Sequence, residues 1–229
     1  MNREQRFYPL AWPFLVGLLA LLAGLVVLVQ VGVLRYVYAR LGVPPRYVFA
    51  VLLLELLGSS LNIPVARFRT AASAGIRRVV VFGVVYVVPV VREPRVTILA
   101  VNVGGAVIPS ALAVYLTVHT GDWLDALLCT AIVTVAVNMM ARPVPGLGIA
   151  VPTLLPGVVA AAAAALVTST HHAPPAAFTA GTLGTLIGAD VMNIPKIRSL
   201  GAPVASIGGA GTFDAVFVTG IVAVLLVTL

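Results

Sequence analysis

Residues 188–196 read GADVMNIPK and residues 208–214 read GGAGTFD, and these two segments decide how the rest of the chain is interpreted. Each carries one aspartate, Asp190 or Asp214, beside a long apolar run. A carboxylate at the edge of a membrane span costs free energy unless a partner, water or a proton compensates it, so it indicates function. The sequence therefore predicts a functional site at these two aspartates.

Composition predicts an integral membrane protein. Of 229 residues, 61% are hydrophobic and 9% are charged, and the mean hydropathy is +1.12, whereas soluble domains carry about 25% charged residues. The net charge of +7 indicates basic loops beside the membrane rather than nucleic-acid binding. The single cysteine, Cys129, excludes a disulfide framework and a cysteine-based metal site. We expect membrane lipid as a partner, a multi-pass location in the cell inner (plasma) membrane, and no cofactor.

Seven apolar segments predict an all-α polytopic fold, with residues 1–229 as a single integral membrane domain. The expected spans are residues 9–33, 47–61, 96–118, 124–141, 152–168, 176–191 and 212–229. The second is short, contains Glu55 and ends in GSSLNIP at residues 58–64, so it either crosses or re-enters the membrane. Basic residues in short loops place the N-terminus inside, whereas a re-entrant second segment would place it outside.

A basic stretch separates the second and third segments. Residues 65–95 carry six arginines around an apolar run that is rich in valine and interrupted by Gly83. Runs of β-branched residues on either side of a glycine are typical of paired strands. The sequence predicts a basic extramembrane insertion here, folded as a small β-hairpin.

Further polar residues are expected at the depth of the two aspartates. They are Asn62, Asn102, Asn138, Asn193 and Lys196, with Gly208, Gly209 and Gly211 close by. A single buried asparagine often only joins helices, but this many at one depth predict a substrate-binding site. The histidines of residues 171–172 are expected on the opposite face without a carboxylate, so no metal site is predicted.

Two resemblances appear at these residues. The strings VNVGGA at 101–106, GTLGTLIGAD at 181–190 and LGAPVASIGGAGTFD at 200–214 resemble a family of bacterial and archaeal multispanning membrane proteins of unknown function. The aspartate pair is also similar to that of the two-aspartate intramembrane proteases, the presenilin and signal-peptide-peptidase group.

In that protease group one aspartate ends a span with a lysine six residues later, as Asp190 and Lys196 do, and a Gly-x-Gly-Asp motif opens the next span. This chain differs at three points. Two residues separate the second glycine from Asp214, Ala189 replaces the usual tyrosine, and no Pro-Ala-Leu element follows. The resemblance implies catalysis by Asp190 and Asp214.

Three functions are consistent with these residues. An aspartic intramembrane endopeptidase would hydrolyse single-span membrane peptides, with one carboxyl as base and the other as acid. A secondary transporter or channel would bind a cation or proton at the same aspartates, and the repeated NIP motif at 62–64 and 193–195 would mark its broken segments. A structural or partner-binding membrane subunit, alone or in an oligomer, would use Asp190 to cap a helix end and Asp214 to cap a helix start.

Overall fold

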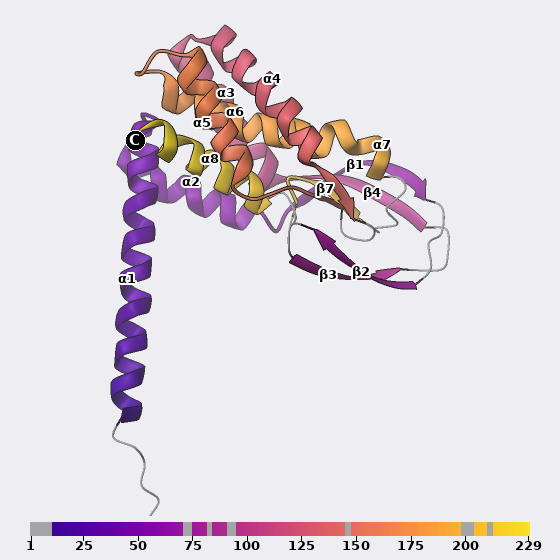
Figure 1. The fold of residues 1–229 in the computed structure, drawn as a ribbon, viewed down its shortest axis with the longest axis horizontal. Helices are drawn as coiled ribbons and strands as arrows, with labels where there is room; N and C mark the ends of the chain where they lie inside the picture. The colour runs from indigo at the N-terminus through magenta and orange to yellow at the C-terminus, as the bar shows by residue number, and fades with distance from the viewer. Residues whose placement is uncertain are drawn as a thin grey trace, which may run out of the picture.

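The computed structural model describes residues 11–70, 75–81, 84–90, 95–144, 148–197, 204–209 and 213–229. Helices form a bundle with strands at one end (Figure 1). The helices are α1 (Ala11–Arg40), α2 (Pro45–Gly58), α3 (Ile108–Thr120), α4 (Trp123–Met140), α5 (Leu155–Val167), α6 (Ala173–Thr185), α7 (Ile194–Ile197) and α8 (Phe213–Val227). The π-helical turn η1 (Val103–Val107) precedes α3, and the π-helical turn η2 (Leu186–Asp190) and the 3-10 turn η3 (Val191–Asn193) follow α6.

Helix α6 lies at the centre of the bundle, and its small residues let its neighbours approach closely. Gly184 of α6 and Gly188 of the following turn η2 face α4, where a Cβ atom on Gly188 would lie 2.5 Å from the carbonyl oxygen of Thr134. Gly181 faces Thr219 of α8 in the same way. Close approach through small residues is typical of helices that pack inside a membrane.

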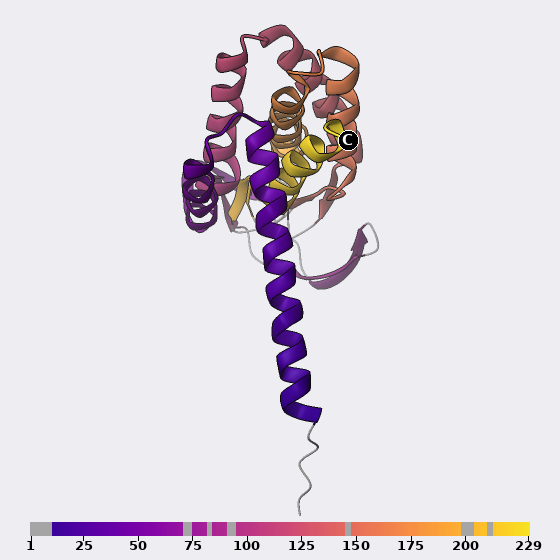
Figure 2. The same cartoon turned by 90° about the vertical axis from the view of Figure 1, so that its left-hand side faces the viewer.

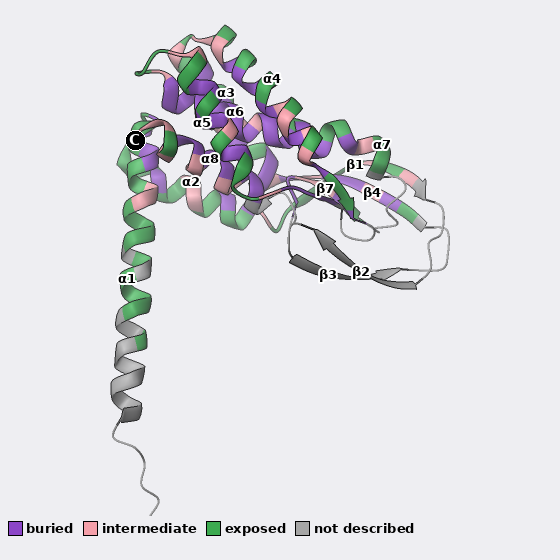
Figure 3. Cartoon of the chain, in the orientation of Figure 1, coloured by how far each residue is buried: buried purple, intermediate pink, exposed green. Residues whose placement is uncertain are grey.

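The outer surface of the bundle is apolar. Buried residues lie between the helices and exposed ones cover the outside (Figure 3). On α4 the exposed large apolar side chains are Trp123, Leu124, Leu127, Leu128, Ile132, Val135 and Met139. Because an apolar surface of this kind is stable in hydrocarbon rather than in water, it is suited to contact with lipid.

Three helices in the described residues are long and apolar enough to span a membrane: Leu22–Arg40, Val103–Thr120 and Trp123–Met140. Leu155–Val167 and Ala215–Val227 are apolar but shorter. The three helices indicate a membrane protein, whereas the predicted count of seven spans is not confirmed. Helix α1 extends away from the bundle (Figures 1 and 2), and it is buried near its C-terminal end, at Val37 and Tyr38.

A three-stranded sheet closes one end of the bundle. It contains β1 (Asn62–Thr70), β4 (Arg95–Asn102) and β7 (Val204–Ile207), in the order β1-β4-β7. The β1 and β4 strands are antiparallel, with Asn62 opposite Asn102, and β4 and β7 are parallel, with Val101 opposite Ile207. The sheet therefore joins the segment after α2 to the segment before α8.

Two hairpins complete the strand structure. β2 (Gly75–Val81) and β3 (Val84–Val90) pair antiparallel within the stretch where the sequence predicted a hairpin, and β5 (Arg142–Val144) pairs with β6 (Gly148–Ala150). The strand region is longer than residues 65–95, because β1 begins at Asn62 and β4 ends at Asn102. A location of the β2–β3 hairpin outside the bilayer stays a prediction.

Two predicted membrane segments are wrong at their ends. Residues 96–102 were expected to begin the third span but form β4, and residues 62–64 were expected to end a broken helix but begin β1. β4 is the central strand, paired on both edges and buried at Thr97, Leu99 and Ala100. A short, fully apolar run cannot be distinguished by periodicity from part of a helix.

The predicted internal repeat is also wrong as a structural unit. The first NIP motif, at residues 62–64, lies on β1, whereas the second, at residues 193–195, runs from η3 into α7. The sequence matches therefore do not correspond to matching structures.

We expect Gly104→Ala to destabilise the protein by roughly 3 kcal/mol, because overpacking a tight contact forces the backbone apart. A Cβ atom on Gly104 would lie 2.0 Å from the carbonyl oxygen of Glu55 and 2.3 Å from the nitrogen of Ser59. Gly32→Ala is the matched control, since nothing lies within 4 Å of its added Cβ atom. Thermal unfolding in detergent would test this, and equal melting temperatures for the two variants would contradict it.

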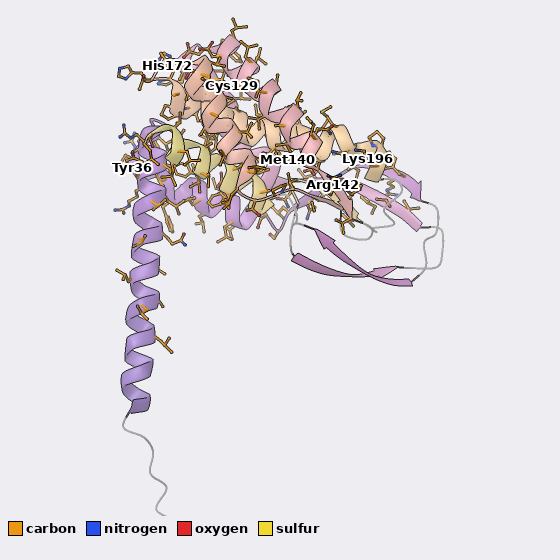
Figure 4. The ribbon with its side chains drawn as sticks, in the orientation of Figure 1. Tyr36, Cys129, Met140, Arg142, His172 and Lys196 are labelled. Carbon is orange, nitrogen blue, oxygen red and sulfur yellow. The ribbon has the colours of Figure 1, made fainter. Side chains whose placement is uncertain are left out.

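We also expect Lys196 and Arg142 to face one side of the membrane and His172 to face the other. Lys196 and Arg142 lie toward the sheet, whereas His172 lies at the far end of the bundle (Figure 4). Single cysteines placed by Lys196→Cys, Arg142→Cys and His172→Cys would be labelled with an impermeant maleimide in oriented vesicles. Labelling of all three from one side would disprove this arrangement. The native Cys129 is fully buried, so the wild-type protein serves as the control for background labelling.

Candidate functional site

Asp190 is the last residue of η2, and its carboxyl group is buried with 4% of the residue exposed. Its Oδ2 accepts a hydrogen bond of 2.7 Å from the backbone nitrogen of Gly208. Gly208 directly follows β7 and leads toward α8. The hydrogen bond therefore joins the end of η2, which continues α6, to the segment between β7 and α8 that leads to Asp214.

Gly208 has no room for a side chain. Its φ of +67° is in the left-handed region that favours glycine. A Cβ atom would also lie 2.6 Å from the carbonyl carbon and oxygen of Gly105 in η1. The segment that holds Asp190 thus lies directly against the backbone of η1.

Asn102 joins three elements on the other side of this contact. Its Nδ2 donates to the carbonyl oxygen of Ser59 at 2.7 Å and to Oδ1 of Asn62 at 3.1 Å. Its Oδ1 accepts from the backbone nitrogen of Gly105 at 2.7 Å, which caps η1. Ser206 of β7 also donates to Oδ1 of Asn62. This group ties the end of α2, the sheet and η1 together.

Asn138 and Asn193 meet at the start of the GAD segment. Both donate through Nδ2 to the carbonyl oxygen of Gly188, at 3.1 and 3.0 Å. Asn193 is fully buried, and its Oδ1 accepts from Nζ of Lys196 at 2.7 Å. The bonds satisfy a carbonyl oxygen where a π-helical turn interrupts the regular helix, which is a common position for functional sites.

The predicted polar residues thus fall into two groups, around Asn102 and around Gly188. Asp190 follows Gly188 in the chain, and through Gly208 it reaches η1, which Asn102 caps. Gly209 donates to the carbonyl oxygen of Ser206 at 3.0 Å. Gly211 and the side chain of Asp214 lie outside the described residues, and the backbone of Asp214 is in the first turn of α8.

Glu55 is a further buried carboxyl group that the site prediction did not include. Only 3% of the residue is exposed, although its neighbours on α2, Leu54 and Leu56, are 56% and 64% exposed. Oη of Tyr38 donates to its Oε2 over a long 3.5 Å. The sequence did contain a signal for this burial. Glu55 is the single acid in an apolar segment, and its spacing of seven residues from Val48 places both on the same face of a helix.

Glu55 also borders a small cavity. The cavity wall is formed by α2, η1, α3 and α8, through Glu55, Gly104, Gly105, Pro109, Val216 and Phe217. The carbonyl oxygen of Glu55 lies directly against Gly104. Glu55 and Gly208 thus both pack against the glycines of η1.

The opposite end of the bundle carries the histidines. Nδ1 of His172 contacts the carboxyl group of Asp122, so the expectation that these histidines lie without a carboxylate is wrong. The ring of His119 stacks on Tyr115 with centroids 5.8 Å apart. Among the described residues, no three His, Cys, Asp or Glu side chains are arranged to hold a metal ion. The contact between His172 and Asp122 joins the starts of α6 and α4, whereas Tyr115 and His119 both belong to α3.

We expect Glu55→Gln to remove a pH dependence of stability. Burial raises the pKa of the Glu55 carboxyl to about 7, and α2 is not one of the three candidate spans. At a pH between the ordinary pKa of a glutamate and about 7, Glu55 is protonated in the folded state and ionised in the unfolded state. The free energy of unfolding of the wild type should therefore fall as the pH rises through this window. The loss is on the order of 3 kcal/mol at most. Denaturation between pH 5 and pH 8 would measure it, and an equal slope in the variant would contradict it.

Comparison with curated proteins and with solved structures finds no match. A family profile matches residues 56–226, from the end of α2 to α8, and thus covers about three quarters of the chain. The description of this family does not connect it to the two-aspartate proteases. The resemblance to a family of unknown function is confirmed: the chain belongs to the family described as "Protein of unknown function (DUF1614)".

Proposed function

We propose that the protein is an aspartic intramembrane endopeptidase in which Asp190 and Asp214 form the catalytic pair. The observation that carries this proposal is the hydrogen bond from the Gly208 nitrogen to the buried Asp190 carboxyl, at 2.7 Å. It connects one aspartate to the segment that leads to the other. A buried carboxyl oriented by the backbone is suited to catalysis, because its geometry is fixed before substrate binds.

The packing of α6 against α8 supports the pairing. Gly181 lies against Thr219 and Gly220 lies against Phe178, so the two helices run in opposite directions. Leu186 of η2 packs with Val216 of α8 in one apolar cluster. Asp190 follows Leu186 by four residues and Asp214 precedes Val216 by two, so both aspartates belong to the same end of this helix pair.

Such a pair of carboxyl groups would share one proton. The ionised carboxyl takes a proton from water while the water oxygen attacks the carbonyl carbon of a peptide bond. The protonated carboxyl donates to the carbonyl oxygen. The carboxyl that took the proton from water then gives it to the amide nitrogen as the C–N bond breaks, and a hydroxyl group of the intermediate returns a proton to the other carboxylate.

The position of β7 supports a peptide substrate. β7 pairs with β4 along one edge, and among the described strands no other strand pairs with it. It ends at Ile207, next to Gly208 and so to Asp190. An extended peptide can add to an open strand edge through backbone hydrogen bonds, which would bring a single-span membrane peptide to the aspartate.

A second candidate is a secondary transporter or channel for protons or cations. It is favoured by the two π-helical turns, η1 beside Glu55 and η2 ending at Asp190. Irregular helix segments beside buried carboxyl groups are typical of ion and proton sites in membrane transporters. Either function implies a multi-pass protein of the cell inner membrane, alone or as an oligomer.

For the endopeptidase we expect Asp190→Asn and Asp214→Asn each to lower peptide cleavage by roughly 10⁴-fold. The double variant should lose little more, because members of one catalytic unit are not additive. Proteoliposomes with a panel of single-span peptides would provide the assay. The Asp190→Asn variant keeps an oxygen acceptor for Gly208, so its thermal unfolding should resemble that of the wild type.

Asp125→Asn is the matched control, because Asp125 starts α4 beside Asp122, at the end of the bundle away from the sheet. It should cleave at the wild-type rate. Cleavage that persists in Asp190→Asn or Asp214→Asn would disprove the catalytic pair. Ion or proton uptake that depends on the two aspartates, without any cleavage, would establish the transporter instead.

A further inference from the structure

The turn between α1 and α2 carries exposed arginines that have no acidic partner. Arg40 ends α1, and Arg46 is the second residue of α2. Both are exposed, and no carboxylate among the described residues forms an ion pair with either of them. Exposed cations beside an apolar surface attract anions from outside the protein, and at a membrane these anions include lipid headgroups.

Each of these arginines is held against a tyrosine. The guanidinium of Arg40 lies 5.1 Å from the ring centroid of Tyr36, and that of Arg46 lies 4.8 Å from the ring centroid of Tyr47. Stacking uses the face of a guanidinium and leaves N–H donors in its plane, which match the geometry of a phosphate. Tyrosine is also enriched at the level of the lipid headgroups. The turn therefore presents two oriented cations that are suited to a phosphate.

Backbone hydrogen bonds and packing fix this turn. The nitrogen of Gly42 donates to the carbonyl oxygen of Ala39, and that of Val43 donates to the carbonyl oxygen of Tyr38, both at 3.0 Å. Tyr38, Leu41 and Val43 are buried in one apolar cluster with residues of the bundle. The two arginines are thus attached to a well-packed part of the fold.

The turn lies at the end of the bundle opposite Lys196 and Arg142, as the position of Tyr36 shows (Figure 4). Basic residues therefore occur at both ends of the bundle. The preference of Lys and Arg for one side of the membrane can account for one of these two sets only. The phosphate of a lipid headgroup is an anion that is present on both sides, so it can compensate the other set.

An apolar groove lies along α1 below the turn. Its volume is about 380 Å³, which is a usual size for a ligand pocket. Its described lining consists of Leu25, Val29, Gln30 and Val33. At 3.6 residues per turn, Leu25, Val29 and Val33 lie on the same face of the helix as Tyr36 and Arg40. A hydrocarbon chain in this groove would therefore have its headgroup at Arg40.

Gln30 is the one polar side chain in the described lining of the groove. It lies six residues before Tyr36, which is about 9 Å along the helix axis. The ester carbonyls of a phospholipid follow its phosphate toward the hydrocarbon in the same way. Because an amide in an apolar environment costs free energy unless it is hydrogen-bonded, an ester carbonyl is a suitable acceptor for Gln30.

We propose that this corner of the protein binds one anionic phospholipid. Arg40 and Arg46 bind its phosphate, the amide of Gln30 donates to an ester carbonyl, and an acyl chain lies in the groove along α1. A zwitterionic headgroup fits less well, because it carries a cation that the two arginines repel. The site is independent of the proposed endopeptidase, since it uses no residue of the Asp190 site.

Native mass spectrometry of the full chain in detergent, titrated with phosphatidylglycerol or phosphatidylcholine, tests this site. We expect one tightly bound phosphatidylglycerol and weaker binding of phosphatidylcholine. Arg40→Gln and Arg46→Gln should each weaken phosphatidylglycerol about fivefold, as expected for one basic residue at an anionic headgroup. Val29→Trp should also weaken it, because the larger side chain fills the groove. Arg35→Gln is the matched control, since Arg35 is exposed but lies about 140° around the helix from Arg40, and it should bind as the wild type does.

Equal affinity for the two lipids would overturn the proposal, and so would a loss in Arg35→Gln as large as that in Arg40→Gln. Inorganic phosphate that binds as tightly as phosphatidylglycerol would assign the arginines to a soluble anion instead. A lipid-free dimer that dissociates in Val29→Trp would assign the groove to a second copy of this chain. Each substitution changes an exposed side chain, so thermal unfolding in lipid-free detergent should match the wild type and separate loss of binding from loss of folding.

Discussion

The absence of side chains at Gly104 and Gly208 allows three backbone segments to meet, and the candidate site depends on this contact. The carbonyl oxygen of Glu55 reaches Gly104 from one side, and Gly208 touches Gly105. Asn102 caps the same π-helical turn and bonds to the end of α2. Each buried backbone group here has little space for water, so direct hydrogen bonds must satisfy it. The turn η1 thus fixes the positions of Asp190 and Glu55.

Much of the helical fold follows from hydropathy. Six of the seven apolar segments correspond closely to helices, because long apolar runs in a chain with few charges have little alternative to helix. The third segment shows where this reasoning fails. Residues 96–102 are as apolar as a span but pair with β1 and β7, and such long-range pairing leaves no local signal. The β-branched residues that predicted the β2–β3 hairpin continue into β4.

The candidate site was predictable in its parts but not in its arrangement. Polar residues in an apolar chain are conspicuous, so Asp190, Asn102 and Asn193 stood out from composition alone. Their partners did not, since Gly208 and Gly105 contribute backbone groups that any residue possesses. Glu55 was visible as an acid, but its burial depends on the packing of α2 against α1, η1 and α3. Contacts between distant segments, such as that of Gly105 with Gly208, cannot be derived from spacing.

The contacts around Asp190 favour proton chemistry over binding of a metal cation. Oxygen-binding cations such as Ca²⁺ take six to eight oxygen ligands. Asn138 and Asn193 donate their amide nitrogens to the carbonyl oxygen of Gly188. The amide oxygen of Asn193 accepts a hydrogen bond from Lys196. A lysine at this position would repel a cation and compete for its ligands. Acid–base catalysis requires neither a ligand shell nor a metal, so the same hydrogen bonds that disfavour an ion site are compatible with a catalytic carboxyl.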